Sequence, residues 1–286
     1  MNPPIGFALV THSNPHQLER LIGRLNAMFD HPPIACHHDF SQCPLSPERF
    51  SKNVSFVRPH LRTAWASFAF LQAIVRAIEQ LYAAPVNPDW FVLLSGNDYP
   101  IKPAAQILND LQAGGHDAHI CHELVRADAL ETAWQKESYA RYCCRYLRVP
   151  LTKKVFIARH PILKKLLLPF SKDFHCYSGS DWFSANHRAA QYIIESHKSN
   201  VRLANHYRRV IIPSESYFHT ILANAPALKL NNNNWRYTDW SAGGPHPKRL
   251  GLADMPKILA SPAHFARKFD LNQDATVFDQ LDKVTA

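Results

Sequence analysis

Apolar strand-like runs alternate with amphipathic helix-like stretches through about residue 121, and this alternation constrains the fold more than any other feature of the sequence. The pattern predicts strands at 5–10, 33–38, 54–57 and 90–95, and helices at 16–29 and about 63–82. Such alternation is typical of a parallel sheet with helices on both faces. We therefore expect an α/β fold.

Polar residues follow three of these predicted strands. Thr11 and His12 follow the first, Asp39 the second, and Asn97 and Asp98 the fourth. Ligands of open α/β sheets bind at the carboxyl ends of the strands, so these positions are candidate binding residues. Asp39 is a candidate for a contact to a ribose hydroxyl, whereas turn chemistry alone could explain Asn97 and Asp98.

The run Cys36, His37, His38 and Asp39 contains the residue types of a metal site. Adjacent side chains on a strand point to opposite faces, so this spacing does not gather ligands on one side. We therefore expect no metal ion at this run.

The second half of the chain has a less regular pattern. Residues 122–175 are rich in aromatic and basic side chains, and 153–172 has the composition of a basic amphipathic segment. That segment is predicted either to lie on an anionic membrane surface or to form a solvated flap, since two prolines interrupt any long helix. The elements predicted after residue 176 are a strand near Trp182 and Phe183, a helix at 187–197, a strand at 209–212 and a helix from 214.

Composition describes a globular chain with excess positive charge. The 286 residues are 46% hydrophobic, which is enough for a substantial core, and the net charge of +9 favours polyanions, anionic lipid surfaces or phosphorylated ligands. No apolar run is long enough to span a membrane, the N-terminus lacks the features of a secretion signal, and the six cysteines form no C-x-x-C pair. We expect a cytoplasmic protein with reduced thiols, or one held peripherally at the inner membrane face through 153–172.

Several motifs of common enzyme classes are absent from the sequence. There is no G-x-G-x-x-G, no G-x-x-x-x-G-K-[ST], no H-E-x-x-H and no G-x-S-x-G, which disfavours dinucleotide enzymes, P-loop NTPases, zincins and α/β-hydrolases. The D-x-D pair that would hold a divalent cation against a nucleotide diphosphate is also missing. Any phosphate charge would then be met by Lys and Arg.

Two basic segments near the C-terminus are candidate anion sites. Trp240 precedes a loop rich in glycine and proline that ends in Lys248 and Arg249, and Arg267 and Lys268 lie between two phenylalanines. Half-burying cations between aromatic residues is costly unless an anion pairs with them. An exposed basic loop would explain the first segment equally well.

The segment VIIPSESYFHT, residues 210–220, places Glu215 where a predicted strand meets a predicted helix. Pro213 stops the strand, and Ser214 is the predicted N-cap. Glu215 then lies in the first turn, where the helix dipole favours an ionised carboxylate by about 0.3 to 1 kcal/mol. Such a carboxylate can stabilise the helix or act as a general base, and the local pattern leaves both open.

Seven segments in fixed order resemble the core-2/I-branching β-1,6-N-acetylglucosaminyltransferase family, which includes the peptide O-xylosyltransferases. They are LVTHSNPHQLERLI, CHHDFS, FVLLSGNDYPIKP, YSGSDWFSAN, PSESYFHTIL, RYTDWSAGGPHPKRL and ILASPAHFARKFD, and they extend over about residues 5–270. The resemblance implies a GT-A-like glycosyltransferase fold, with a mixed, largely parallel sheet. We expect one glycosyltransferase domain over 1–286, with a nucleotide-binding half at about 1–121 and an acceptor-binding and catalytic half at about 122–286.

The resemblance also implies roles for single residues. The Glu of the family's P-x-E segment is the general base, and it matches Glu215. The Lys of the F-A-x-K-F motif takes the place of a metal on the diphosphate and matches Lys268, with Arg267 adjacent. A further family cation corresponds to either Lys248 or Arg249.

The remaining expected contacts divide between donor and acceptor. The donor side is expected to include Thr11, His12, Asp39, Arg62 and Asp98. The acceptor side is expected to include Trp182 and Trp240, with Glu123 as a hydrogen-bonding candidate, although core packing is the commoner fate of a Trp such as Trp182.

The resemblance therefore implies an inverting transfer of a sugar, GlcNAc ahead of xylose, from a UDP-sugar to a hydroxyl of a glycan or glycoconjugate. The UDP-sugar is a co-substrate, and no divalent metal and no other cofactor is expected. The alternative is a non-catalytic nucleotide-binding or glycan-binding protein with the same fold. A nucleic-acid partner is not expected, because the sequence contains no known nucleic-acid recognition motif.

Overall fold

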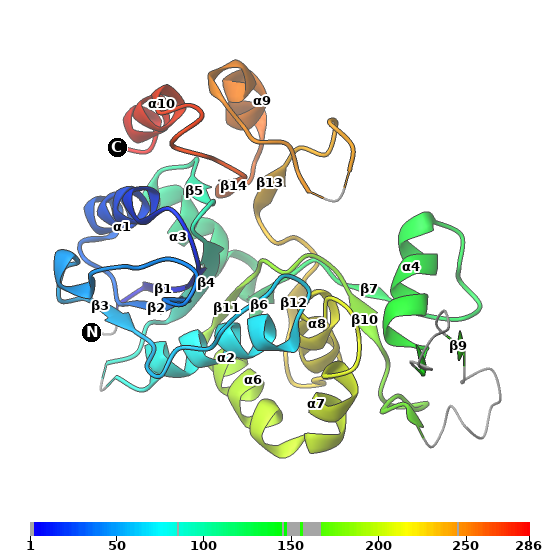
Figure 1. Cartoon of the computed structure of the whole chain (residues 1–286). Helices are drawn as coiled ribbons and strands as arrows, with labels where there is room; N and C mark the ends of the chain where they lie inside the picture. The colour runs from blue at the N-terminus through cyan, green and yellow to red at the C-terminus, as the bar shows by residue number, and fades with distance from the viewer. Residues whose placement is uncertain (1–2, 85, 145, 148–154, 157–166, 245) are drawn as a thin grey trace.

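A seven-stranded sheet forms the centre of the computed structural model, which describes residues 3–84, 86–144, 146–147, 155–156, 167–244 and 246–286 (Figure 1). In order across the sheet, the strands are β12 (Leu230–Asn231), β6 (Ala118–His119), β11 (Ser184–Asn186), β4 (Trp90–Ser95), β1 (Ile5–Thr11), β2 (Ile34–His38) and β3 (Val54–Phe56). β11 runs antiparallel to both of its neighbours, and the other neighbouring pairs are parallel. The expected largely parallel α/β sheet is confirmed.

Helices cover both faces of this sheet, as the sequence predicts (Figure 1). One face is packed by α1 (Pro15–Phe29), α3 (Ala104–Gln112) and α10 (Thr276–Val284), and the other by α2 (Phe68–Tyr82), α6 (His187–Ser199) and α8 (Ser214–Ala223). Along β1 the side chains alternate, so Phe7 and Leu9 join the first core and Ala8 and Val10 join the second. The sheet is therefore buried on both sides.

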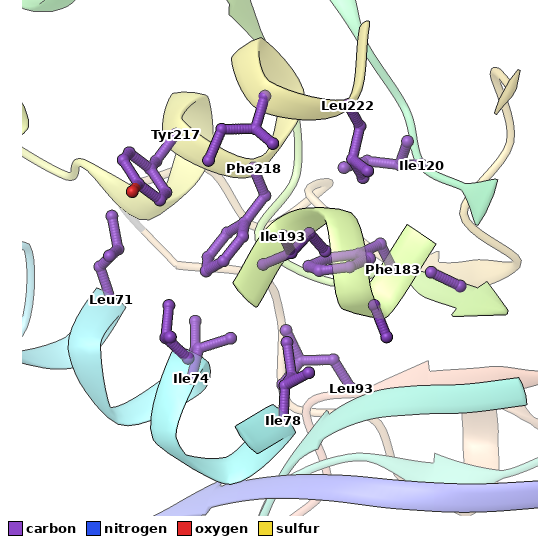
Figure 2. Packing of buried hydrophobic residues seen from close by; sticks show 14 of the residues in the cluster. Leu71, Ile74, Ile78, Leu93, Ile120, Phe183, Ile193, Tyr217, Phe218 and Leu222 are labelled. Carbon is purple, nitrogen blue, oxygen red and sulfur yellow. The ribbon is translucent and has the colours of Figure 1, made fainter. Parts of the chain in front are cut away.

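The second core is built where α2, α6 and α8 converge. Figure 2 shows Ile74 of α2, Ile193 of α6 and Phe218 of α8 turned toward one another, with Phe183 between the helices and the sheet. Phe183 and Phe218 have ring centroids 5.5 and 5.4 Å from neighbouring aromatic rings, Phe91 and Phe183 respectively. This packing fixes the first turn of α8, which carries Glu215, relative to the sheet.

The remaining elements lie outside the central sheet. The other helices are α4 (Ala133–Tyr142), α7 (Val201–Tyr207) and α9 (Met255–Ala260), with short 3-10 turns at Pro47–Arg49, Ala113–Gly115 and Leu252–Asp254. The smaller sheets pair β13 (Arg236–Thr238), β14 (Phe265–Arg267) and β5 (Tyr99–Pro100), β10 (Tyr177–Ser178) with β7 (Glu123–Leu124), and β8 (Tyr146–Leu147) with β9 (Val155–Phe156).

The prediction of a strand at 209–212 is wrong. These residues form turns, in which the N–H groups of Arg209 and Val210 donate to His206 and Tyr207, and Ile212 has a left-handed backbone with φ of 52°. The β-branched composition that suggested a strand instead serves a tight connection into α8. Tertiary contacts have overridden local β-propensity here.

Three other boundaries shift. The helix predicted from about residue 63 starts at Phe68, because the Ser67 hydroxyl accepts from the Phe70 N–H and ends the preceding loop. The strand expected near Trp182 and Phe183 begins at Ser184. Ser214 is the first residue of α8 and not its N-cap.

The predicted membrane-surface segment 153–172 lies largely outside the residues that the structure describes. Its contact with an anionic surface therefore stays a prediction. Among the helices that the structure describes, none combines the length and the hydropathy of a membrane span.

Candidate functional site

A cavity of about 1530 Å³ opens at the carboxyl ends of β1 and β4. Val10 and Ser95, near the ends of these strands, line it together with His12 and Asn97, which follow them. This is where the sheet topology predicts a ligand site. The opposite walls come from α4, the segment after β10, the start of α8, β13 and the segment at 267–268.

Glu215 lies in the first turn of α8 and lines this cavity with its side chain 24% exposed. Its Oε2 accepts a hydrogen bond of 2.9 Å from Nη1 of Arg141. The Glu215 carbonyl accepts from the Gly179 N–H at 2.8 Å, which joins α8 to the segment after β10. Both the backbone and the carboxylate of Glu215 are therefore held in place.

The ionisation of Glu215 differs from the sequence expectation. Burial and, after it, the charge of Asp181 together raise the pKa of Glu215 from an ordinary 4.5 to about 8, and Arg141 opposes this rise. The helix N-terminus was expected to keep this carboxylate ionised, but the dipole supplies only about 0.3 to 1 kcal/mol, which desolvation beside a second carboxyl outweighs. In the free chain, Glu215 therefore keeps its proton to higher pH than an ordinary glutamate does.

Asp181 is the second carboxyl of the site and also lines the cavity. Burial raises the pKa of Asp181, while the Ser214 hydroxyl and Arg267 act in the opposite direction. Asp181 therefore interacts electrostatically both with Glu215 and with Arg267 on the cation wall described below. Ionising both Asp181 and Glu215 has a high free-energy cost because the two negative charges repel each other, so the titrations of the two carboxyls are linked.

A glycine allows the segment that carries Asp181 to approach the sheet. A Cβ at Gly179 would lie 1.9 Å from the Cys121 carbonyl oxygen and 2.9 Å from Cδ2 of His219. Only glycine therefore fits this position, between β10 and the residues Asp181 and Trp182 that face the cavity.

Three cations meet on another wall of the cavity: Arg236 of β13, Arg267 of β14 and Lys268. The Arg267 guanidinium lies over the Trp182 ring, with Cζ 4.3 Å from the ring centroid. Its Nε is 3.6 Å from Oδ1 of the fully buried Asp98. Asp98 thus lies behind the cations, where it also accepts a 2.7 Å bond from the Ser95 N–H.

The positive charge at this wall is only partly compensated. Burial lowers the pKa of Arg236 to about 10, with Arg267 adding to the effect and Asp98 opposing it. Burial and Arg267 also lower the pKa of Lys268. Cations destabilised by one another and by desolvation are favourably placed to bind an anion such as a diphosphate.

Lys248 and Arg249 do not line the cavity. Lys248 Nζ donates to Asp254 Oδ1 at 2.6 Å, and Arg249 pairs with Asp270 at 3.4 Å. The cation that lines the cavity together with Arg267 and Lys268 is Arg236, and neither Lys248 nor Arg249 is part of this wall.

The predicted donor residues are divided by the structure. His12 lines the cavity, whereas Arg62 is exposed outside its lining. Thr11 is buried and its hydroxyl bonds Nδ1 of His38 at 2.8 Å. Thr11 therefore links the end of β1 to the end of β2 and does not line the cavity.

Asp39 is also buried beneath the cavity lining. Its Oδ1 accepts from the Ser41 N–H at 3.0 Å, and its Oδ2 accepts from Gln42 Nε2 at 2.7 Å and from the Thr63 N–H at 2.6 Å. Burial by itself would raise the pKa of Asp39, but these hydrogen bonds hold it well below its usual range. Gln42 and Thr63, which Asp39 orients, line the cavity in its place.

The predicted acceptor residues all line the cavity. Trp240 is 56% exposed, so its ring is available to a sugar face, whereas Trp182 is buried and packs in the core beneath Arg267. Trp182 therefore both packs in the hydrophobic core and lines the cavity. Glu123 is tied to α4, because its Oε1 accepts a 2.8 Å bond from Gln135 Nε2.

The family model "Branch: Core-2/I-Branching enzyme" matches residues 6–259. The chain belongs to this family. The resemblance inferred from the seven sequence segments is confirmed.

Two kinds of glycosyltransferase are among the proteins to which this chain is similar. "Xylosyltransferase 1" of Homo sapiens is 25% identical over 305 residues, which cover 97% of this chain and 30% of that protein. "Beta-glucuronosyltransferase GlcAT14A" of Arabidopsis thaliana is 27% identical over 199 residues, covering 68% and 42%. The chain spans less than half the length of these relatives.

Among solved structures, the chain is similar to "WbbM bifunctional glycosytransferase apo structure". The TM-score is 0.35 at 10% sequence identity, with 98% of this chain and 52% of that chain covered.

Arg141, Asp181 and Arg236 line the cavity but were not predicted from the sequence. Arg141 lies in the irregular stretch 122–175, where no pattern distinguishes it. Asp181 and Arg236 lie inside two of the segments that carried the family resemblance, so they could have been proposed on that ground. Within the described residues, no three His, Cys, Asp or Glu side chains gather in a manner that could hold a metal ion.

Proposed function

We propose that the chain is an inverting glycosyltransferase that moves a sugar from a UDP-sugar to a hydroxyl of a glycan or glycoconjugate acceptor, without a divalent metal. The observation that carries the proposal is that one cavity brings Glu215 together with Arg236, Arg267 and Lys268. A carboxylate and a group of cations are the two elements that this reaction requires from a protein.

The chemistry is a single displacement at the anomeric carbon. The acceptor oxygen forms a bond to C1 as the bond between C1 and the diphosphate oxygen breaks, so configuration inverts. The acceptor proton passes to Glu215, and the electron pair of the broken bond leaves with UDP. Arg236, Arg267 and Lys268 stabilise the negative charge that grows on the leaving diphosphate.

The raised pKa of Glu215 fits a base that works in a desolvated site. A carboxylate with a pKa of about 8 is a stronger proton acceptor than one near 4.5, so it better matches a sugar hydroxyl. Arg267 lies close enough to Asp181 to lower its pKa. Arg236, Arg267 and Lys268 together would favour an anionic donor bound next to this base.

The proposed donor is one of three UDP-sugars. The family resemblance favours GlcNAc ahead of xylose, the name of one relative supports xylose, and the name of the other adds glucuronic acid as a donor sugar to test. UDP is the part of the donor that the family resemblance implies, and the three cations would bind its diphosphate whichever sugar it carries.

The first experiment is nucleotide binding. UDP and UDP-GlcNAc, UDP-xylose and UDP-glucuronate are compared by thermal shift, each with Mg²⁺ and with EDTA. We expect stabilisation by UDP that does not depend on metal. Stabilisation only when Mg²⁺ is present would contradict the proposed role of the three cations.

The second experiment is turnover by Glu215→Gln. The stabilising donor is incubated with a panel of glycan acceptors, and UDP release and product are measured. We expect the variant to bind UDP normally and to lose transfer by about 10²- to 10⁴-fold. Normal turnover would overturn the assignment of the base, and UDP binding without transfer or donor hydrolysis in the wild type would point to a non-catalytic binding protein.

A further inference from the structure

Glu215 is held by a residue from the irregular stretch 122–175. Arg141, in the last turn of α4, donates from Nη1 to Glu215 Oε2 at 2.9 Å and from Nη2 to Glu137 on the preceding turn of the same helix. The Arg141 side chain is only 19% exposed. A guanidinium bridging two carboxylates has a fixed orientation, because its donors form a planar fork.

The body of the protein holds α4 firmly in this position. Near its middle, Ser138 accepts a 3.1 Å hydrogen bond from the Ser178 hydroxyl of β10, beside which α4 lies in Figure 1. At its C-terminal end, the Tyr142 hydroxyl donates to the Ile212 carbonyl at 3.0 Å, and His206 Nε2 donates to the Tyr142 carbonyl at 2.8 Å.

The Tyr142 contact links α4 directly to the start of α8. The Ile212 carbonyl that accepts from Tyr142 also accepts from the Glu215 N–H at 3.3 Å. Arg141 and Glu215 are therefore fixed relative to each other both through their side chains and through the backbone of residues 212–215. This is the geometry of a built contact and not of two mobile surface side chains.

We propose that Arg141 is a positioning residue for the general base: it holds the Glu215 carboxylate in one orientation toward the acceptor and sets the pH range over which that carboxylate accepts a proton. This inference rests on the proposed function, in which Glu215 is the base. Arg141 acts through Glu215 and takes no proton itself.

The charges around Glu215 determine the direction of the effect. The groups that act on it are Arg141 and Glu137 from α4 and Asp181 from the segment after β10, while Tyr142 lies close enough to feel its charge and Arg267 acts on Asp181. Arg141 is the cation that favours the ionised form, and Glu137 and Asp181 disfavour it. Loss of Arg141 therefore raises the pKa of Glu215, and loss of Glu137 lowers it.

The test compares Arg141→Met, Arg141→Lys and Glu137→Gln with the wild type. The donor that the thermal-shift panel identifies is used at saturation, and donor hydrolysis or transfer is followed by UDP release from pH 5.5 to 9.5. We expect Arg141→Met to lower kcat by about 10- to 100-fold with little change in the donor KM, and to move the acidic limb of the profile to higher pH. Arg141→Lys should restore part of both effects.

Glu137→Gln makes the test directional, because its acidic limb should move to lower pH while that of Arg141→Met moves to higher pH. Arg49→Met is the matched control, since Arg49 also pairs with a glutamate, Glu19 at 3.1 Å, on the exposed surface and outside the cavity lining. It should leave the profile unchanged. A merely structural role for Arg141 would change melting temperature without moving the two profiles in opposite directions.

A second readout does not depend on turnover. In protein labelled with ¹³C-glutamate at the side-chain carboxyl, the Glu215 signal is assigned by its absence in Glu215→Gln and is titrated by NMR. The Arg141→Met signal should titrate at higher pH than the wild-type signal. An unchanged titration in Arg141→Met, with Glu215→Gln inactive, overturns this inference alone, whereas an active Glu215→Gln overturns the proposed function on which it rests.

Discussion

The guanidinium of Arg267 lies between the face of Trp182, 4.3 Å from its ring centroid, and the buried Asp98 carboxylate, 3.6 Å away. Among the described residues, neither Arg267 Nε nor Asp98 Oδ1 has a hydrogen-bond partner, although both atoms are buried. The aromatic ring and the carboxylate fix the cation in the cavity wall without using all of its donors. The remaining hydrogen-bonding capacity of Arg267 suits a diphosphate.

Replacing Arg267 by Met should weaken UDP binding. Charge-assisted hydrogen bonds contribute about 1.5 to 3 kcal/mol, so we expect the Kd for UDP to rise by about 10- to 100-fold. Isothermal titration calorimetry measures this directly. Arg249→Met is the matched control, because Arg249 pairs with Asp270 outside the cavity lining, and its Kd should stay near the wild-type value. The opposite ranking of the two variants would show that the loop at 239–250 holds the diphosphate.

The rate of the reaction should rise with pH up to about 8. Glu215 must be ionised to accept a proton, and its pKa in the free chain is raised to about 8 by burial and by Asp181. The pH profile of kcat/KM reports this free-enzyme value. A profile already flat from pH 6 would mean that Glu215 is ionised well below its raised pKa and that the desolvation argument fails.

The same carboxyl should make folding stability depend on pH. Because the folded pKa lies above the ordinary 4.5, the folded chain holds a proton that the unfolded chain has released, and the contribution of Glu215 to stability falls as pH rises from 4.5 to about 8. Glu215→Gln removes this term. The melting temperature of Glu215→Gln minus that of the wild type should therefore increase between pH 5 and pH 8.5, as scanning calorimetry can test.

Gly179→Ala should disrupt the site and the fold together. The added methyl would lie 1.9 Å from the Cys121 carbonyl oxygen, so the segment carrying Asp181 and Trp182 must move. We expect a loss of about 1 to 3 kcal/mol in unfolding free energy, measured by urea denaturation, together with a large loss of turnover. Gly23→Ala, in the interior of α1 with nothing within 4 Å of the new methyl, should instead stabilise by about 0.5 to 1 kcal/mol.

Asp39→Asn should act on stability first and on donor binding only through Gln42 and Thr63. Loss of a charged acceptor for three N–H donors is expected to cost about 1 to 3 kcal/mol at pH 7. Since the folded pKa is lowered from 3.8, this stabilisation is present above pH 3.8 and is lost as pH falls below it. Urea denaturation of both proteins at pH 7 and pH 3 should show the difference narrowing. A difference of equal size at both values would count against an ionised Asp39 as the source.

Local sequence patterns predicted most of the fold. Periodicity placed β1, α1, β2, β4 and α6 within a few residues of their observed limits, because the spacing of apolar residues is a property of contiguous chain. The strand predicted at 209–212 failed because its conformation depends on a hydrogen bond from the Ile212 N–H to the Ala66 carbonyl, a residue far away in the sequence. Propensity does not contain that information.

The sequence by itself determined the α/β architecture, the family, and Glu215, Arg267 and Lys268 as candidates, since each of these follows from contiguous residues. Only the tertiary structure placed Arg236, and neither Lys248 nor Arg249, in the cavity wall with Arg267, and brought Arg141 to Glu215 across 74 positions of the chain. The pKa of Glu215 was decided there too, because desolvation and the charge of Asp181 depend on which distant groups share a cavity. Short-range patterns specify the elements, whereas the electrostatics of a site arise from residues that meet only when those elements pack.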